Sequence, residues 1–369
     1  MPQEQRWRKT SREVSGLTVF YILLSILLFG VLILVHEFGH FICAKLFGVQ
    51  VNEFSLFMGP AIWKKKKGET LYVLRCIPIG GYCAMEGEDG ESENPRAFGN
   101  AKVWKRFLIL IAGSFMNLLL GLLITVIFTS VYFDDALPTA RIVSFMDDCP
   151  YESETGFQTG DELYSIDGER VYILNDFSLL MERNGTQVYD IVVLRDGEKV
   201  ELNDFTLKKL DYDGVQRYGL TFRYEEKTLG SVLSYSWNQS RDFARLVRMG
   251  LQDLLTGKAG LSEMGGPVLI VQTVTQAGVA SKDVGLGILN VLYFFAFIAI
   301  NLGIMNLLPI PALDGGRVVC LLVTTAAEKV LRRKINPKYE GYLHAVFMIL
   351  LLIFMALITF KDIFRLFGG

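Results

Sequence analysis

The chain of 369 residues has little cysteine, little histidine and almost no net charge, and each shortage narrows what it can be. Its five cysteines, at positions 43, 76, 83, 149 and 320, include no Cys-x-x-Cys pair, so they predict no disulfide framework and are given no function. The formal net charge is −2, and the one lysine run, Lys64–Lys67, has only Trp63 as an aromatic neighbour. We therefore assign that run to lipid headgroups and expect no nucleic-acid partner.

Apolar residues are what the chain has in excess, since 51% of it is hydrophobic and its mean hydropathy is +0.33. We do not expect the apolar run of residues 17–44 to be a removable signal peptide, because it is too long and lacks a small-residue cleavage site. Gly113, Ser114 and Asn117, in the apolar run of residues 107–133, are assigned to helix packing, with direct lining of the site as the lesser alternative. The composition predicts a polytopic α-helical membrane protein with at least one soluble domain. Four runs reach the length of about 20 residues that spans a bilayer: residues 17–44, 107–133, 285–313 and 342–360.

Two of the three histidines stand in the first run, in the sequence His36-Glu37-Phe-Gly-His40. Residues four apart share one face of a helix, so both imidazoles can reach one ion, with Glu37 beside it as a base for bound water. Zinc is the metal expected, because paired imidazoles with an open position suit it. The alternative, that these groups only cap a membrane helix, is disfavoured because each costs roughly 2.5–3.5 kcal/mol to insert.

A catalytic zinc takes three protein ligands and a water, so one more ligand is needed. The third run ends in a segment with two prolines and a glycine pair, which unwinds a helix and is tolerated where backbone lines a cavity. Asp314 is the one carboxylate there and is the third ligand we predict. Two alternatives stay open: Asp314 caps the helix that continues from Gly315, or it pairs with Arg317. His344 is assigned to packing or the membrane interface rather than to the metal.

Two regions between the runs have β character. Residues 46–106 contain strand-like patches that turn at Gly68-Glu69. An edge strand beside a protease site can pair with an unfolded segment through main-chain hydrogen bonds, although a plain hairpin that caps the helix ends explains the pattern equally well. Residues 134–226 predict a compact domain with turns at Asp167-Gly168 and Asp196-Gly197. An amphipathic helix is expected from Ser240 to Leu255.

Charge is distributed unevenly along the chain. Residues 45–106 carry ten Lys and Arg, whereas residues 134–287 hold 25 Asp and Glu against 15 Lys and Arg. By the positive-inside rule we expect the first and third loops in the cytosol and the acidic domain outside, although the basic N-terminal tail opposes this orientation. His36 would then lie roughly 6–12 Å from the cytosolic end of its helix. The third loop contributes Lys329, Arg332, Arg333, Lys334 and Lys338.

Taken together, these motifs resemble the site-2 protease family of intramembrane zinc metalloproteases, in its bacterial RseP-like branch. The resemblance covers nearly the whole chain, and no CBS-type domain is present, which argues against the sporulation branch. It rests on His36-Glu37-x-x-His40, on Asn306-x-x-Pro309-x-Pro311-x-Leu313-Asp314-Gly315, and on a domain with Gly160-Asp161 and Ile166-Asp167-Gly168. It implies Zn²⁺ ligation by His36, His40 and Asp314, with Glu37 as catalytic base. It also implies a membrane-dipping β-hairpin and a substrate path, to which we assign Asn301, Asn306, Gly80, Gly81 and Tyr82.

The resemblance further identifies the middle region as one extracytoplasmic PDZ-like α+β domain. Tyr218-Gly219-Leu220-Thr221-Phe222 is similar to a PDZ peptide-groove strand placed at the end of the domain. Such a domain either binds a peptide or acts as a bulk filter that excludes substrates with intact outer domains. The expected organisation is: tail and first helix, 1–45; hairpin loop, 46–106; second helix, 107–133; PDZ domain, 134–226; amphipathic helix and linker, 227–284; third helix, 285–327; cytosolic loop, 328–341; fourth helix and C-terminus, 342–369.

The function expected from these features is hydrolysis of single-pass transmembrane segments in the bacterial plasma membrane. Anti-sigma factors and signal-peptide remnants are the substrates implied, after prior trimming of the substrate's outer part. One alternative is a membrane-anchored zinc protease that works at the bilayer surface in protein quality control. Another is a metal transporter or a non-enzymatic metal-binding scaffold, but the sequence shows one ligand cluster rather than a series through the membrane.

Overall fold

The computed structural model describes residues 2–88, 90, 92–258, 260, 265–281, 283–332 and 338–368. Arg333 and Lys334, which were assigned to the third loop, lie outside the described residues. The chain divides into two compact units, one of residues 1–124 with 243–369 and one of residues 125–242. Each unit is described by itself.

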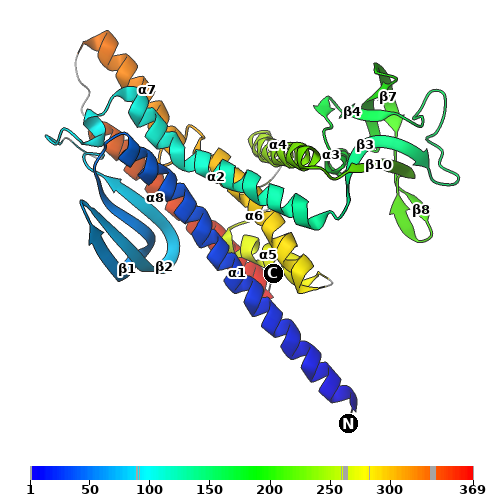
Figure 1. The fold of residues 1–369 in the computed structure, drawn as a ribbon, viewed down its shortest axis with the longest axis horizontal. Coiled ribbons are helices and arrows are strands. Elements are labelled where there is room, and N and C mark those ends of the chain that lie inside the picture. The colour runs from blue at the N-terminus through cyan, green and yellow to red at the C-terminus, as the bar shows by residue number, and fades with distance from the viewer. Residues whose placement is uncertain are drawn as a thin grey trace. The chain divides into compact units, whose positions relative to one another are not determined.

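Long apolar helices dominate the first unit (Figure 1). Within the described residues, four are long and apolar enough to cross a membrane: Gly16–Leu46, Val103–Tyr132, Val284–Asn306 and Tyr339–Arg365. These segments belong to α1 (Pro2–Leu46), α2 (Val103–Tyr132), α6 (Val284–Asn306) and α8 (Lys338–Gly368). The predicted polytopic membrane protein with four spans is confirmed.

The third predicted span is shorter than expected, because α6 ends at Asn306 and a separate helix, α7 (Asp314–Leu331), follows a loop of residues 307–313. Pro309 and Pro311 have no N–H to continue the helix, and each disfavours helical geometry in the residue before it. The unwinding predicted from these prolines is therefore present. It makes Asp314 the first residue of a new helix.

One helix of the first unit was missed by the sequence analysis. The stretch 227–284 was treated as an amphipathic helix and linker, but it contains α5 (Pro267–Val279) as well as α4 (Leu229–Leu255). Asp362 of α8 caps α5, accepting hydrogen bonds from Gly266 N at 2.9 Å and Leu269 N at 3.1 Å. Pro267 at the first helical position is a local signal for the start of α5, but the cap itself comes from a distant part of the chain.

Apolar side chains of α1, α5 and α6 form one core of the first unit. Tyr21 is 1% exposed, and its ring lies against Gly278 and Gly287, where a side chain would collide with it. Glycine at these two positions therefore permits close packing of the helices. The buried members of this core are Tyr21, Leu32, Val274, Val291, Phe295 and Ala299.

The predicted hairpin consists of β1 (Val51–Lys67) and β2 (Thr70–Met85), with its turn at Gly68-Glu69, and both strands contact α1 (Figure 1). Both strands bend, so residues 51–56 pair with residues 81–85 on one side and with residues 71–74 on the other. Residues 81–85 thus form one edge of the small sheet. No further strand in the described part of the chain pairs with that edge.

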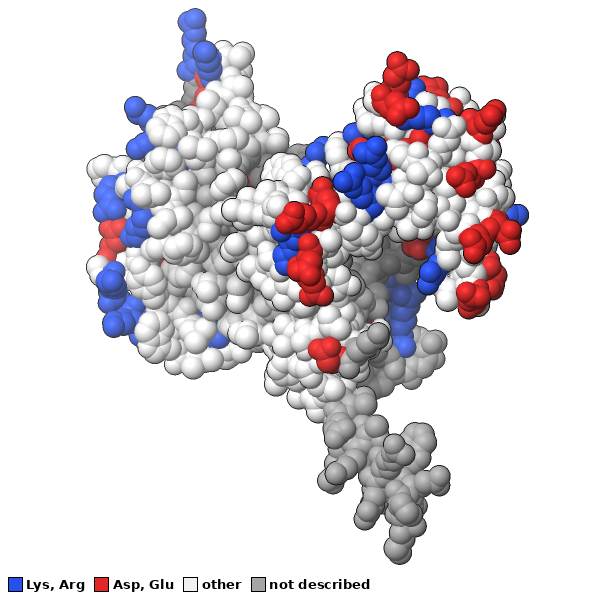
Figure 2. Space-filling model, turned by 45° about the vertical axis from the view of Figure 1, so that its right-hand side comes forward, with Lys and Arg blue, Asp and Glu red and all other residues white. Residues whose placement is uncertain are grey.

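The second unit contains a mixed β and α domain. Its sheet has the antiparallel order β10-β3-β4-β6-β7, with β5 beside β4. The predicted turns at Asp167-Gly168 and Asp196-Gly197 join β4 to β5 and β6 to β7. On the face drawn in Figure 2, Asp and Glu gather over this unit, while much of the first unit is uncharged. The elements are β3 (Ala136–Phe145), β4 (Glu162–Ile166), β5 (Glu169–Arg170), α3 (Leu174–Asn184), β6 (Val188–Arg195), β7 (Glu198–Thr206), β8 (Leu210–Tyr212), β9 (Val215–Arg217) and β10 (Leu220–Glu226).

Candidate metal centre

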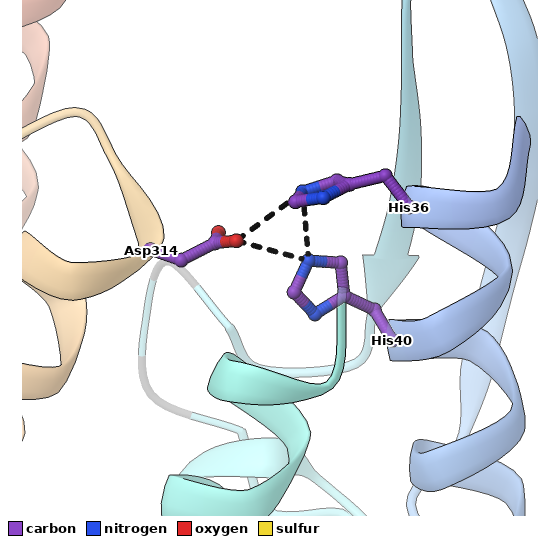
Figure 3. Close-up of side chains that lie close together, drawn as sticks. All are labelled: His36, His40 and Asp314. Atoms are coloured by element: carbon purple, nitrogen blue, oxygen red, sulfur yellow. Dashed lines mark hydrogen bonds and ion pairs between the residues drawn. The ribbon is translucent and has the colours of Figure 1, made fainter. Parts of the chain in front are cut away.

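His36, His40 and Asp314 meet inside the first unit (Figure 3). The two histidines project from one face of α1, and Asp314 reaches toward them from the start of α7. The Nε2 atoms are 3.3 Å apart, and Asp314 Oδ2 lies 3.2 Å from His36 Nε2 and 3.4 Å from His40 Nε2. The predicted proximity of these side chains is therefore present.

The spacing of these three atoms fits a zinc ion. Bonds of about 2.0–2.1 Å in a tetrahedral site place neighbouring ligand atoms roughly 3.3 Å apart. The observed separations are 3.2, 3.3 and 3.4 Å. The side chains of His36, His40 and Asp314 keep 12%, 10% and 19% exposure, so the centre is partly accessible rather than sealed.

The hydrogen bond of His40 supports the same reading. His40 Nδ1 lies 2.8 Å from the carbonyl oxygen of Ile109, which can only accept, so the proton of the neutral ring is on Nδ1. Nε2 then presents a lone pair toward Asp314 Oδ2, which also carries lone pairs. A cation between these atoms resolves the repulsion, and the backbone contact is the kind that orients metal-bound histidines.

Asn117 of α2 lies at the centre, which was the lesser alternative in the sequence analysis. Its side chain is fully buried, and its amide nitrogen lies 3.3 Å from His36 Nδ1. In that orientation Asn117 Oδ1 is buried without a hydrogen-bond partner. Because the amide oxygen and nitrogen are nearly interchangeable in shape, turning the amide would let Oδ1 accept a hydrogen bond from His36 Nδ1–H. Asn117 then orients His36 as Ile109 orients His40.

Small residues let α1 and α2 approach at the centre. A side chain at Gly113 would collide with the ring of His40 and would lie 2.8 Å from His36 Cε1. A side chain at Gly39 would collide with the backbone of Ala112. The Ser114 hydroxyl lies 3.5 Å from Asp314 Oδ2. The signal available in the sequence was the small or polar character of residues 113, 114 and 117 within an apolar run.

Glu37 lies between the centre and the hairpin edge. A side chain on Gly81 would come within 3.1 Å of Glu37 Cγ and 3.0 Å of Ser55 O, so the edge strand passes directly beside Glu37. Gly80 has a φ of 67°, which a side chain would strain. The Tyr82 hydroxyl donates to Glu53 Oε1 at 2.6 Å and accepts from an arginine, so it belongs to a polar network of the hairpin.

In the structure, other residues occupy the positions that the two alternative roles, helix capping and pairing with Arg317, would give to Asp314. The residue at the N-cap of α7 is Leu313, and Arg317 forms an ion pair with Glu88. Asn301 and Asn306 lie on α6, both partly exposed, and Asn306 is its last residue. Their assignment to the substrate path stays a prediction, as does that of Gly80, Gly81 and Tyr82.

A second group of three ligand-type side chains lies in the same unit. One ligand atom from each of Cys320, Glu340 and His344 falls within 4.8 Å of the others. The predicted packing residue His344 accepts a hydrogen bond at Nδ1 from Ala312 N, at 2.9 Å. This group therefore touches the loop that precedes Asp314.

Comparisons with known proteins identify the family to which this chain belongs. The sequence model of peptidase family M50 matches residues 24–354. A Clostridium perfringens protein named "Putative zinc metalloprotease CPE1693" is 35% identical over 354 residues, covering 93% of this chain and 98% of its own length. "Regulator of sigma-W protease RasP" of Bacillus subtilis is 26% identical over 430 residues, covering 94% of this chain and 99% of its own. "Zinc metalloprotease RasP" of Oceanobacillus iheyensis is 28% identical, covering 93% and 98%.

Proposed function

This chain belongs to peptidase family M50, the site-2 proteases, and is a membrane-embedded zinc metalloendopeptidase; from that premise we propose that it cuts single-pass transmembrane segments. In this proposal His36, His40 and Asp314 hold the zinc and Glu37 is the catalytic base. The observation that carries it is the set of 3.2–3.4 Å separations among three ligand atoms, two of which come from a membrane-spanning helix.

A zinc ion held by His36, His40 and Asp314 would supply Lewis-acid chemistry, which polarises a carbonyl and lowers the pKa of water to about 7. Glu37 takes the proton of the attacking water and returns it to the leaving amide nitrogen. Ile109 and Asn117 hold the imidazoles of His40 and His36 with Nε2 toward the ion. The partial exposure of the three ligand side chains supports entry of the water that hydrolysis requires.

Substrate enters this scheme as an extended strand. A transmembrane helix keeps its carbonyl groups in internal hydrogen bonds, so it must unwind before one can be attacked. The edge at residues 81–85 offers main-chain pairing to such a strand, and Gly81 lies beside Glu37. Strand addition at this edge would therefore bring a peptide bond to the base and hold it extended.

The second unit supports a proposal for substrate selection. Its strand β10 lies at an edge of the sheet, and a cavity of about 260 Å³ beside it is lined by Phe177, Tyr218, Leu220 and Phe222, among others. An edge strand facing an apolar helix surface is the arrangement in which PDZ domains add a peptide strand. We propose a PDZ-like domain that either binds the trimmed end of a substrate or excludes untrimmed ones.

The charge distribution supports a plasma-membrane orientation with the basic hairpin loop in the cytosol and the acidic second unit outside. The substrate class we propose is anti-sigma factors or signal-peptide remnants, because one relative is named a regulator of sigma-W. A cysteine at the exposed position 203 tests the orientation, with Cys149 replaced by Ala. It should react with an impermeant reagent from outside, and reaction only from the cytosol would reverse the topology.

The catalytic proposal is tested with purified full-length protein and a candidate single-span substrate. Wild type, Glu37→Gln and Asp314→Asn are compared for zinc content and for cleavage. We expect the Gln variant to keep zinc and lose cleavage, and the Asn variant to lose both. Cleavage by Glu37→Gln at the wild-type rate would end the mechanistic proposal.

A further inference from the structure

The loop of residues 307–313 is strained immediately before the metal centre. Ala312, two residues before Asp314, has a φ of 82° although it is not glycine. A side chain disfavours this left-handed region, and such a conformation persists only where neighbouring groups impose it. The groups that hold Ala312 therefore also decide where Asp314 begins α7.

Contacts from two helices hold this loop. On the α7 side, Gly315 and Gly316 have no Cβ, and one at either position would collide with the carbonyl groups of Leu307 or Ile310. On the α8 side, His344 Nδ1 accepts a hydrogen bond from Ala312 N at 2.9 Å. The His344 side chain is only 13% exposed, so water competes little for this contact. The hydrogen bond falls on the strained residue itself.

The same hydrogen bond shows why His344 is not a metal ligand. A nitrogen that accepts an N–H has no proton, so the neutral ring carries its proton on Nε2. Nε2 lies 3.8 Å from Glu340 Oε1, which is too far for a hydrogen bond, and it is buried without a hydrogen-bond partner among the described residues, but the nearby carboxylate still favours a proton there. A cation at Nε2 would need the proton to move to Nδ1 and would break the bond to Ala312. The group of Cys320, Glu340 and His344 is thus arranged to hold the loop.

We propose that His344 is a positioning residue of the metal centre. It fixes Ala312 in its left-handed conformation, and through it presents Asp314 to the two histidines of α1. The proposal rests on the proposed role of Asp314 as a zinc ligand. It assigns to the fourth membrane helix a part in metal binding although no side chain of that helix touches His36, His40 or Asp314 in the described contacts.

Three substitutions of His344 distinguish loss of the hydrogen bond to Ala312 from loss of side-chain volume. Asn places an amide oxygen where His344 Nδ1 lies, so His344→Asn can keep the bond to Ala312, whereas His344→Gln places its amide near the Nε2 position and His344→Leu has no acceptor. The readouts are the zinc dissociation constant by chelator competition and the visible spectrum of the cobalt-substituted full-length protein. Thr359→Val on the same helix is the matched control, since the Thr359 hydroxyl bonds only within α8, to Met355 O.

We expect His344→Gln and His344→Leu to bind zinc about 10–100-fold more weakly and to change the cobalt spectrum, with His344→Asn and Thr359→Val close to wild type. Equal losses in all three His344 variants would overturn the proposal, as would wild-type affinity in the Gln and Leu variants. If Asp314→Asn loses zinc in that last case, the proposed function stands without this inference. If Asp314→Asn also binds zinc normally, the proposed ligand set itself fails.

Discussion

Among the described residues, two groups of three ligand-type side chains lie in the first unit, and we propose that one of them binds a cation. His36, His40 and Asp314 form the first group, and the second contains Cys320, Glu340 and His344. Both bring their ligand atoms within 4.8 Å of one another. They differ in the hydrogen-bond partner of the histidine Nδ1 atom. This partner is the carbonyl oxygen of Ile109 for His40 and the backbone N–H of Ala312 for His344.

That difference teaches that proximity of ligand atoms does not by itself make a metal site. A carbonyl at Nδ1 keeps the proton there and frees Nε2 for an ion, whereas an N–H at Nδ1 sends the proton to Nε2. The backbone around an imidazole therefore decides whether it binds metal or holds protein.

Zinc content is the strongest test. We expect one zinc per wild-type chain, none in His40→Ala and one in Cys320→Ala, because the hydrogen bond at Nδ1 leaves Nε2 of His40 without a proton and places the proton of His344 on Nε2. Cleavage should vanish in His40→Ala and persist in Cys320→Ala. Elemental analysis after dialysis measures the metal, and two zinc ions in the wild type with one in Cys320→Ala would remove the contrast.

Substitution of Glu37 sharpens the comparison, because Glu37 follows His36 in the sequence and is the base that we propose for the first group. Glu37→Gln should lower the cleavage rate by about 10²–10⁴-fold, since that is the usual contribution of general-base catalysis. Zinc content should be unchanged, and Glu37→Asp should lie between the two. A loss of zinc that parallels the loss of cleavage would make Glu37 a structural residue.

Substitution of Asn117 tests whether the hydrogen bond at His36 Nδ1 supports zinc binding as the hydrogen bond at His40 Nδ1 does. Asn117→Leu removes the acceptor and should weaken zinc binding about 10–100-fold. Asn117→Asp keeps an oxygen for His36 Nδ1–H and should stay near the wild-type affinity. Chelator competition measures both variants, and an Asp variant as weak as the Leu variant would show that Asn117 only fills space.

The smallest effect is expected at Glu69, where charges pair in water without a metal. Hydrogen bonds from Arg96 and Lys45 lower the pKa of Glu69 to about 2 from 4.5. A carboxylate with a lowered folded pKa stabilises the protein above 4.5, and the stabilisation is lost as the pH falls toward 2. Glu69→Gln should cost about 0.2–1 kcal/mol at pH 7, as exposed pairs do.

Thermal unfolding of wild type and Glu69→Gln at two pH values measures this effect. The difference in melting temperature should shrink between pH 7 and a pH of about 3, where the unfolded carboxylate is already protonated. A difference that grows as the pH falls would show that Glu69 contributes through something other than its charge.

Local patterns predicted part of the centre. His36 and His40 are four residues apart, so helical spacing alone placed them on one face with Glu37 beside them. Asp314 followed from the need for a third ligand and from the cost of a carboxylate in an apolar stretch. Asn117 was assigned to packing, because which face of α2 turns toward the histidines depends on the crossing at Gly39 and Gly113.

The fold likewise has features that local sequence patterns predict and features that depend on distant residues. The turns at Gly68-Glu69 and at two Asp-Gly pairs were predictable because each depends on its own residues. The double pairing of residues 51–56 depends on bends in both strands, and α5 begins at a cap supplied by Asp362. The bond between His344 and Ala312 joins residues 32 positions apart, and no local pattern announces it.

The edge at residues 81–85 has a consequence for selectivity. Main-chain hydrogen bonds do not depend on side-chain identity, so this edge would bind any extended polypeptide in much the same way. Under the proposed mechanism, discrimination then arises earlier, in how readily a guest helix melts and in what else is attached to it. Such an enzyme would select substrates by the low stability of their transmembrane helices. A few glycines or prolines in a substrate helix would then matter more than any consensus sequence around the scissile bond.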